Sequence, residues 1–80
     1  MPKEFEKLWL SQWTVRIAYV TGTSNPEYIG EAKPGTADSS TGWRIKKLTY
    51  SGNNVTHVRW ASGNRNFDKE WDERTSYTYT

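Results

Sequence analysis

The sequence predicts an all-β fold: a small antiparallel sandwich or barrel of about five strands, with one short helical turn near residues 67–73. Three observations predict it. Apolar and polar residues alternate in several short segments, turn sequences rich in Gly, Asn and Ser separate these segments, and no long stretch has helical periodicity. At 80 residues the chain has the length of one domain. We expect a single β domain at residues 13–80, preceded by an arm or short helix at residues 1–12.

The first elements are an amphipathic arm and a strand. In residues 4–10 the apolar side chains Phe5, Leu8 and Trp9 recur at helix-like spacing, which predicts a short amphipathic turn or an arm. Residues 13–21 then alternate between apolar and polar side chains and are rich in β-formers. This pattern predicts a half-buried strand.

A second strand and a long loop follow. Residues 27–32 read as a short strand, in which Gly30 indicates a bulge or a close approach of another group to the backbone. Residues 33–42 contain Pro34 and many small polar residues, so they predict a loop. A loop of this length in a small domain indicates a partner contact or a mobile surface segment, and both readings stay open.

Residues 43–50 and 55–61 give the clearest hairpin signal, because two alternating segments flank the turn sequence SGNN. If Tyr50 pairs with Val55, one face of the hairpin is apolar and the other is basic. The expected core residues on this hairpin and just after it are Trp43, Ile45, Val58, Trp60, Phe67 and Trp71. The expected basic face consists of Arg44, Lys46, His57 and Arg59.

The C-terminal stretch NFDKEWDERTSYTYT combines acidic residues with two aromatics and ends in alternating Tyr and Thr. Its carboxylates favour a charged outer face of a short helical turn over a catalytic or cation-binding cluster, because Lys69 and Arg74 lie among them and no glycine forms a calcium-binding turn. Residues 76–80 predict a closing strand. We therefore interpret the segment as a structural clasp.

Composition restricts the chemistry. The chain has five Trp and five Tyr but no cysteine and one histidine, His57, which excludes a disulfide, a thiolate zinc site and a histidine-rich metal site. Buried aromatics remove roughly 150–250 Å² each from water, so they can build a small core. Tyr and Trp are also enriched at interfaces, so each remains a candidate for core or contact surface. No catalytic motif is present, and we expect no enzyme activity, no metal and no cofactor.

Charge and hydropathy restrict the partners. The net charge of +2 is too weakly basic to indicate nucleic acid alone. Nucleic acid is also disfavoured because the expected hairpin register separates the aromatic residues from the cations. No apolar stretch approaches the roughly 20 residues of a membrane span, and the first residues lack a secretory signal pattern. We expect a protein made in a cytoplasm, without a membrane partner.

The stretch from Tyr28 to Thr80, about two thirds of the chain, resembles a group of small proteins encoded by tailed bacteriophages among the genes for virion components. The residues that carry the resemblance are Gly30, Ala32, Pro34, Gly35, Trp43, Ile45, Trp60, Gly63, Phe67, Asp68, Trp71, Asp72 and Arg74. The resemblance implies a small all-β virion protein made in the bacterial host, either a capsid decoration protein or a tail or fibre component. It also implies that Asp72 and Arg74 form a pair that holds the turn.

We therefore expect a non-enzymatic phage structural protein that assembles with other virion proteins or with copies of itself, as a homo-oligomer or in many copies. The candidate assembly contacts are Phe5, Leu8, Trp9, Pro34, Tyr77 and Tyr79. Two alternatives stay open. One is a phage inhibitor that binds a host protein or nucleic-acid complex through the basic hairpin face. The other is a carbohydrate-binding module for host attachment that stacks sugars on exposed Trp or Tyr.

Overall fold

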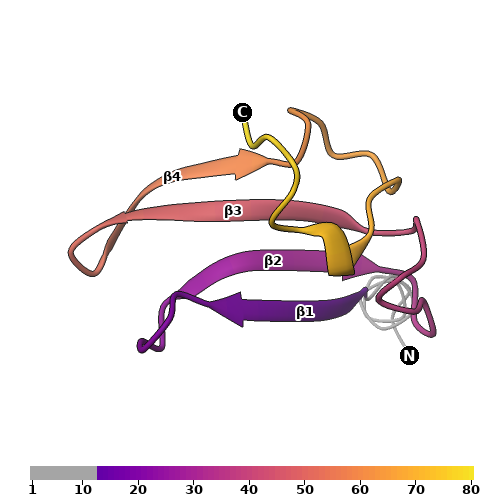
Figure 1. Cartoon of the computed structure of the whole chain (residues 1–80), viewed down its shortest axis with the longest axis horizontal. Helices are drawn as coiled ribbons and strands as arrows, with labels where there is room; N and C mark the ends of the chain where they lie inside the picture. Colours follow the sequence, from indigo (N-terminus) through magenta and orange to yellow (C-terminus); the bar gives the residue numbers. More distant parts are fainter. Residues whose placement is uncertain (1–12) are drawn as a thin grey trace, which may run out of the picture.

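A computed structural model describes residues 13–80, and the expected contacts Phe5, Leu8 and Trp9 lie outside the described residues. The described chain forms one open antiparallel sheet with the strands in sequence order (Figure 1). These strands are β1 (Thr14–Tyr19), β2 (Pro26–Ala32), β3 (Arg44–Ser51) and β4 (Asn54–Trp60), and they are followed by a 3₁₀ turn, η1 (Trp71–Glu73). The all-β class predicted from the sequence is confirmed.

The finer architecture differs from the expectation. The described residues form a single sheet of four strands, without the second sheet of a sandwich or the closure of a barrel. The fifth strand expected at residues 76–80 is reduced to an isolated bridge between Ala61 and Tyr79. The helical turn is also shorter than expected, since it begins at Trp71.

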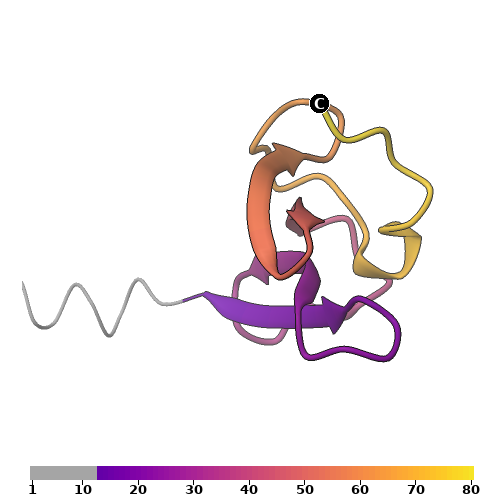
Figure 2. The same cartoon turned by 90° about the vertical axis from the view of Figure 1, so that its left-hand side faces the viewer.

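The core lies on one face of the sheet, which we call the covered face. Directly paired residues share a face, so the pairing of Gly30 with Arg16 on one side and with Ile45 on the other assigns these residues to it. Figure 2 shows the C-terminal segment, here residues 69–80, on one side of the sheet. The buried apolar residues of the described chain are Tyr28, Ala32, Trp43, Ile45, Ala61 and Trp71.

Gly30 allows two indole rings to pack directly on the sheet. A Cβ atom added at this position would lie 2.6 Å from Cε3 of Trp71 and 3.1 Å from Cε3 of Trp43. The two rings lie with their centroids 5.9 Å apart. The glycine therefore marks a close approach of side chains to the backbone, one of the two readings left open by the sequence.

The two ends of the C-terminal segment are hydrogen-bonded to the sheet. At its first residue, Lys69, the segment exchanges two backbone hydrogen bonds of 2.9 Å with Trp43. At the far end, Thr80 exchanges backbone bonds of 3.2 and 3.4 Å with Trp60, the last residue of β4. Because each end is paired and Trp71 between them is buried, the segment acts as the clasp that the sequence predicts.

Two tyrosine hydroxyls close the clasp on itself. The Tyr77 hydroxyl accepts a 2.8 Å hydrogen bond from the backbone N–H of Glu70. The Tyr79 hydroxyl donates a 2.6 Å hydrogen bond to the Arg74 carbonyl, and its ring lies 5.6 Å from that of Tyr28. Burial raises the pKa of the Tyr79 hydroxyl well above its usual range, and the neighbouring tyrosines add to this effect.

The loop at residues 33–42 is joined to the core. The indole N–H of Trp43 donates a 2.9 Å hydrogen bond to the Ala37 carbonyl, and the backbone N–H of Asp72 donates to the Asp38 carbonyl at 3.1 Å. The Asp38 carboxylate also forms an ion pair of 3.3 Å with Arg16 of β1. These bonds favour a structural role for the part of the loop near Ala37 and Asp38, while Pro34 remains exposed.

Candidate binding surface on the open face of the sheet

A bulge in β4 decides which side chains share the second face of the sheet, which we call the open face. Tyr50 pairs with Val55, as expected, but Thr49 pairs with His57, so that Thr56 is an extra residue in β4. Side chains alternate with a period of two along a strand. A shift of one residue therefore turns every later residue of β4 to the opposite face.

Because of the bulge, two residues that the sequence places in the core are not part of it. Trp60 lies opposite Lys46 and Val58 lies opposite Leu48, so both apolar side chains are on the open face. Val58 is 53% exposed and Trp60 is half-buried. Phe67 is also exposed, because the turn that was expected to bury it begins only at Trp71. The other expected core residues, Trp43, Ile45 and Trp71, are buried.

The expected basic face is likewise divided. Arg44 pairs with Glu31 and lies on the open face with Lys46. His57 and Arg59 have the alternate positions in β4 and point to the other side of the sheet. The four residues therefore do not form one continuous surface.

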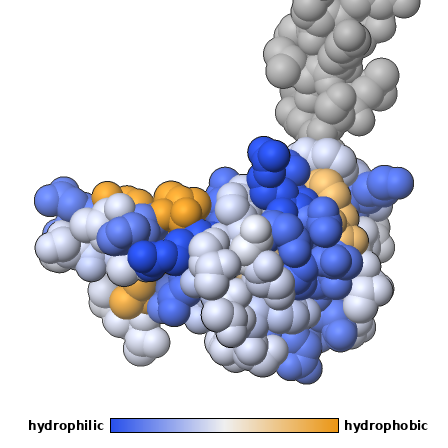
Figure 3. All heavy atoms as spheres, turned by 90° about the horizontal axis from the view of Figure 1, so that it is seen from above, coloured by the Kyte–Doolittle hydropathy of each residue, from blue (hydrophilic) through white to orange (hydrophobic). Residues whose placement is uncertain are grey.

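Apolar side chains remain uncovered on the open face. Ile17 of β1, paired with Ile29, is 44% exposed, and Val15 is 49% exposed. Trp13, two residues before Val15, is exposed as well. Figure 3, seen from the β4 side, shows hydrophobic groups at the surface between hydrophilic ones. Exposed apolar side chains gathered on one sheet face are typical of a contact surface.

Arg44 lies at the centre of an aromatic cluster on this face. Its guanidinium carbon is 4.6 Å from the ring centroid of Phe67, 5.5 Å from that of Trp13 and 5.9 Å from that of Trp60. The Nε–H of Arg44 donates a 2.9 Å hydrogen bond to the Glu31 carboxylate, and the same contact is an ion pair. Cation–π attraction over several rings fixes this guanidinium in place.

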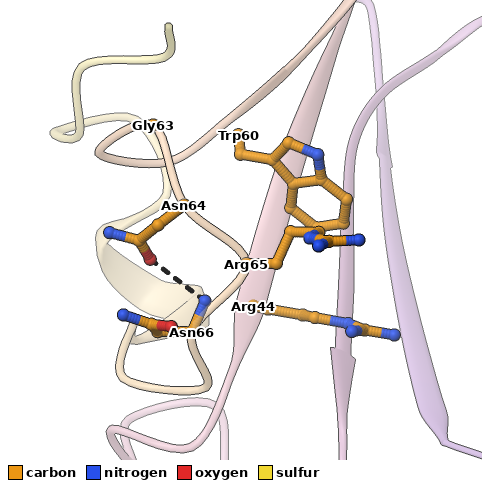
Figure 4. Close-up of a pocket in the computed structure, with 6 residues that line it drawn as sticks. All are labelled: Arg44, Trp60, Gly63, Asn64, Arg65 and Asn66. Atoms are coloured by element: carbon orange, nitrogen blue, oxygen red, sulfur yellow. Dashed lines mark hydrogen bonds between the residues drawn. The ribbon is translucent and has the colours of Figure 1, made fainter.

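Two hollows lie beside this cluster. The larger, of about 720 Å³, is lined by Arg44, Trp60, Gly63, Asn64, Arg65 and Asn66. Figure 4 shows the side chains of Arg44, Trp60 and Arg65 extending in the same direction. The smaller, of about 400 Å³, is lined by Trp13, Lys33, Thr36, Gly42 and Phe67. Sequence reasoning found neither hollow, because residues of both come from separate segments.

The turn after β4 forms one wall of the larger hollow. Ser62 and Gly63 both have positive φ angles, 57° and 72°, so the backbone reverses sharply there. The Asn66 backbone N–H donates a 3.0 Å hydrogen bond to the side-chain oxygen of Asn64 (Figure 4). This local bond holds the turn in the shape that places Arg65 beside the hollow.

The acidic C-terminal stretch forms no site of its own in the described part of the chain. Residues 13–80 contain no group of three or more His, Cys, Asp or Glu side chains placed to hold a metal ion. Asp68 pairs with the buried Lys69. The pair expected between Asp72 and Arg74 is not formed. Arg74 instead donates to the Trp71 carbonyl at 3.2 Å and lies 4.8 Å from the Trp71 ring centroid.

Comparison of the chain with protein-family models, with curated proteins and with solved structures gives no match. Within residues 13–80 no helix has the length and apolarity needed to cross a membrane.

Proposed function

We propose that this protein is a non-enzymatic structural protein of a bacteriophage particle, a capsid decoration protein or a tail or fibre component, and that it assembles through the open face of its sheet. The observation that carries the proposal is the contrast between the two faces. The chain's own C-terminal segment closes one face, whereas Val15, Ile17 and Val58 on the other are about half exposed. Covering apolar surface contributes roughly 25 cal/mol per Å². The assignment to a phage particle rests on the resemblance of residues 28–80.

The occupant that we propose for the open face is the N-terminal segment of a neighbouring copy. Residues 1–12 directly precede Trp13 in the sequence and carry the apolar residues Leu8 and Trp9. Val15 and Ile17, which follow Trp13, are exposed. A layer supplied by a neighbouring chain would give the two-layer arrangement of a sandwich. Exchange of such a segment between identical subunits also suits a symmetric, multi-copy assembly.

The test is the mass of the purified full chain, measured by light scattering over a range of concentrations. We expect a mass above the 9.3 kDa of one chain. Ile17→Asp should reduce it to that of a monomer, because a carboxylate on the open face would lose its hydration on docking. Leu8→Asp should do the same. The matched control is Thr75→Asp, which adds the same charge at an exposed position of the clasp and should leave the mass unchanged.

A full chain that stays monomeric at every concentration would contradict self-assembly. If Leu8→Asp assembles like the unmodified chain while Ile17→Asp does not, the open face is the contact surface but its occupant is not the N-terminal segment. A monomer that loses stability on Leu8→Asp would instead indicate that each chain covers its own sheet.

A further inference from the structure

We propose that the larger hollow beside Trp60 binds single-stranded nucleic acid, with phosphate groups on Arg44, Lys46 and Arg65 and a base stacked on the Trp60 ring. The sequence disfavoured nucleic acid because the expected register separated rings from cations. The bulge at Thr56 removes this separation, because it places the Trp60 ring directly opposite Lys46 on the same face of the sheet.

The charges at this site are only partly compensated. Arg44 is paired with Glu31. No carboxylate of the described residues lies within 4.0 Å of Lys46 or Arg65. Three cations thus face one carboxylate, which leaves the site attractive to an anion. Guanidinium groups bind phosphate through two parallel hydrogen bonds, and Arg44 and Arg65 both line the hollow.

The aromatic partner lies among these cations. The Trp60 ring centroid is 5.4 Å from Nζ of Lys46 and 5.9 Å from the guanidinium carbon of Arg44. Proteins that bind single strands combine cations for the phosphates with aromatic rings on which bases stack. The hollow is open to solvent along the surface, so an extended strand can lie across it. The site therefore has both recognition elements of a single-strand contact, cations and an aromatic ring.

Other anionic partners use fewer of these groups. Carboxylates of an acidic peptide would pair with the cations but would leave Trp60 without a planar partner. Bases inside a duplex are already stacked on their neighbours, so duplex binding would gain nothing from the ring. A single strand engages both the ring and the cations. The site lies on the same open face as the assembly contact proposed above, at its β4 end. Ile17→Asp separates the two proposals, because it should abolish assembly without changing any residue of the hollow.

The experiment measures binding of the full chain to a fluorescently labelled oligothymidylate of about 12 nucleotides by anisotropy, a length within the usual site sizes of single-strand binders. Truncation of a stacking aromatic weakens such binding about 5- to 150-fold, and we expect a loss in this range for Trp60→Leu. Arg65→Gln should also weaken binding. Three phosphate contacts predict a slope of about −2 for log K against log salt, and Arg65→Gln should reduce its magnitude by about 0.7.

The matched control is Arg59→Gln. Arg59 precedes Trp60 in β4 but points to the other side of the sheet, so the same loss of charge there should change the affinity much less. Arg65 is exposed on a turn, so its substitution leaves the core intact. Thermal unfolding of each variant checks that it remains folded. If Trp60→Leu does not fold, the comparison of the affinities of Arg65→Gln and Arg59→Gln for the oligonucleotide tests the proposal.

Several results would overturn the proposal: no binding at low salt, equal losses for Arg59→Gln and Arg65→Gln, or duplex DNA of the same length bound as tightly as the single strand. Binding of a sulfated polysaccharide without binding of the oligonucleotide would assign the site to an anionic glycan and would equally overturn it.

Discussion

Replacement of Gly30 by alanine tests the central packing contact of the fold. The new methyl group would lie 2.6 and 2.8 Å from two carbons of the Trp71 ring, closer than unstrained carbon atoms approach. Both are ring atoms of a buried side chain, so they cannot rotate away as the end of a flexible chain would. Overpacking of this kind costs about 1–3 kcal/mol. Alanine also reduces the conformational entropy of the unfolded chain, which offsets about 0.4–1 kcal/mol of this loss in stability.

The net expectation is a loss of about 1–2 kcal/mol in the free energy of unfolding, measured by denaturant titration with tryptophan fluorescence. For a domain of this size, each 1 kcal/mol lowers Tm by about 4–8 °C. Gly42→Ala is the matched control. Its added methyl would lie 3.1 Å from the methyl and 3.8 Å from the hydroxyl oxygen of Thr36 rather than against a buried ring, and its φ is not positive.

A double-mutant cycle with Trp71→Phe separates the clash from other effects of the new methyl. Phenylalanine lacks the outer ring of the indole, so Gly30→Ala should cost less in that background, with a coupling energy of roughly 0.5–3 kcal/mol. If Gly30→Ala were as stable as the unmodified protein, the indole would not lie on the backbone as described, and the account of the core would be refuted.

Three further predictions test the core, the register and the clasp. Trp43→Ala should cost about 3–5 kcal/mol and come close to unfolding the domain, whereas Trp43→Phe should cost less, as read by thermal unfolding. Val58→Thr should change the free energy of unfolding by less than about 0.5 kcal/mol, because Val58 is exposed. Ile45→Thr should lower it clearly more, because the new hydroxyl would be buried. A larger loss for Val58→Thr than for Ile45→Thr would refute the bulged register. Because the pKa of Tyr79 is raised on folding, its contribution is fully present below the ordinary tyrosine pKa of about 10 and is lost as pH rises through the folded-state pKa. Denaturant titrations across this range should therefore show a smaller alkaline loss for Tyr79→Phe, and equal losses would contradict a buried hydroxyl.

Local pattern was sufficient for the strands and for part of the core. Alternation of apolar and polar residues in 13–21 and in the hairpin predicts strands close to those observed, because a strand exposes alternate residues to opposite faces. Trp43 and Ile45 are buried as predicted, since both precede the bulge and their face does not depend on it. The clasp could also be expected, because so small a domain has to bury most of its large aromatic side chains; Trp71 of the C-terminal stretch is buried, although Phe67 is not.

The candidate site depended on tertiary structure. No residue type in β4 indicates that Thr56 is the extra residue of a bulge. Yet this extra residue moves Trp60 from the expected core to the open face, opposite Lys46. The hollow also needs Arg65, which lies beside Trp60 because the chain turns back after β4, where the Gly63 N–H donates a 3.0 Å hydrogen bond to the Trp60 carbonyl. Periodicity along the chain thus determines which segments are strands, whereas their register is set by the closure of the hairpin and the packing of the clasp. A shift of one residue costs little locally but exchanges the two faces of the sheet, and with them the residues available for binding.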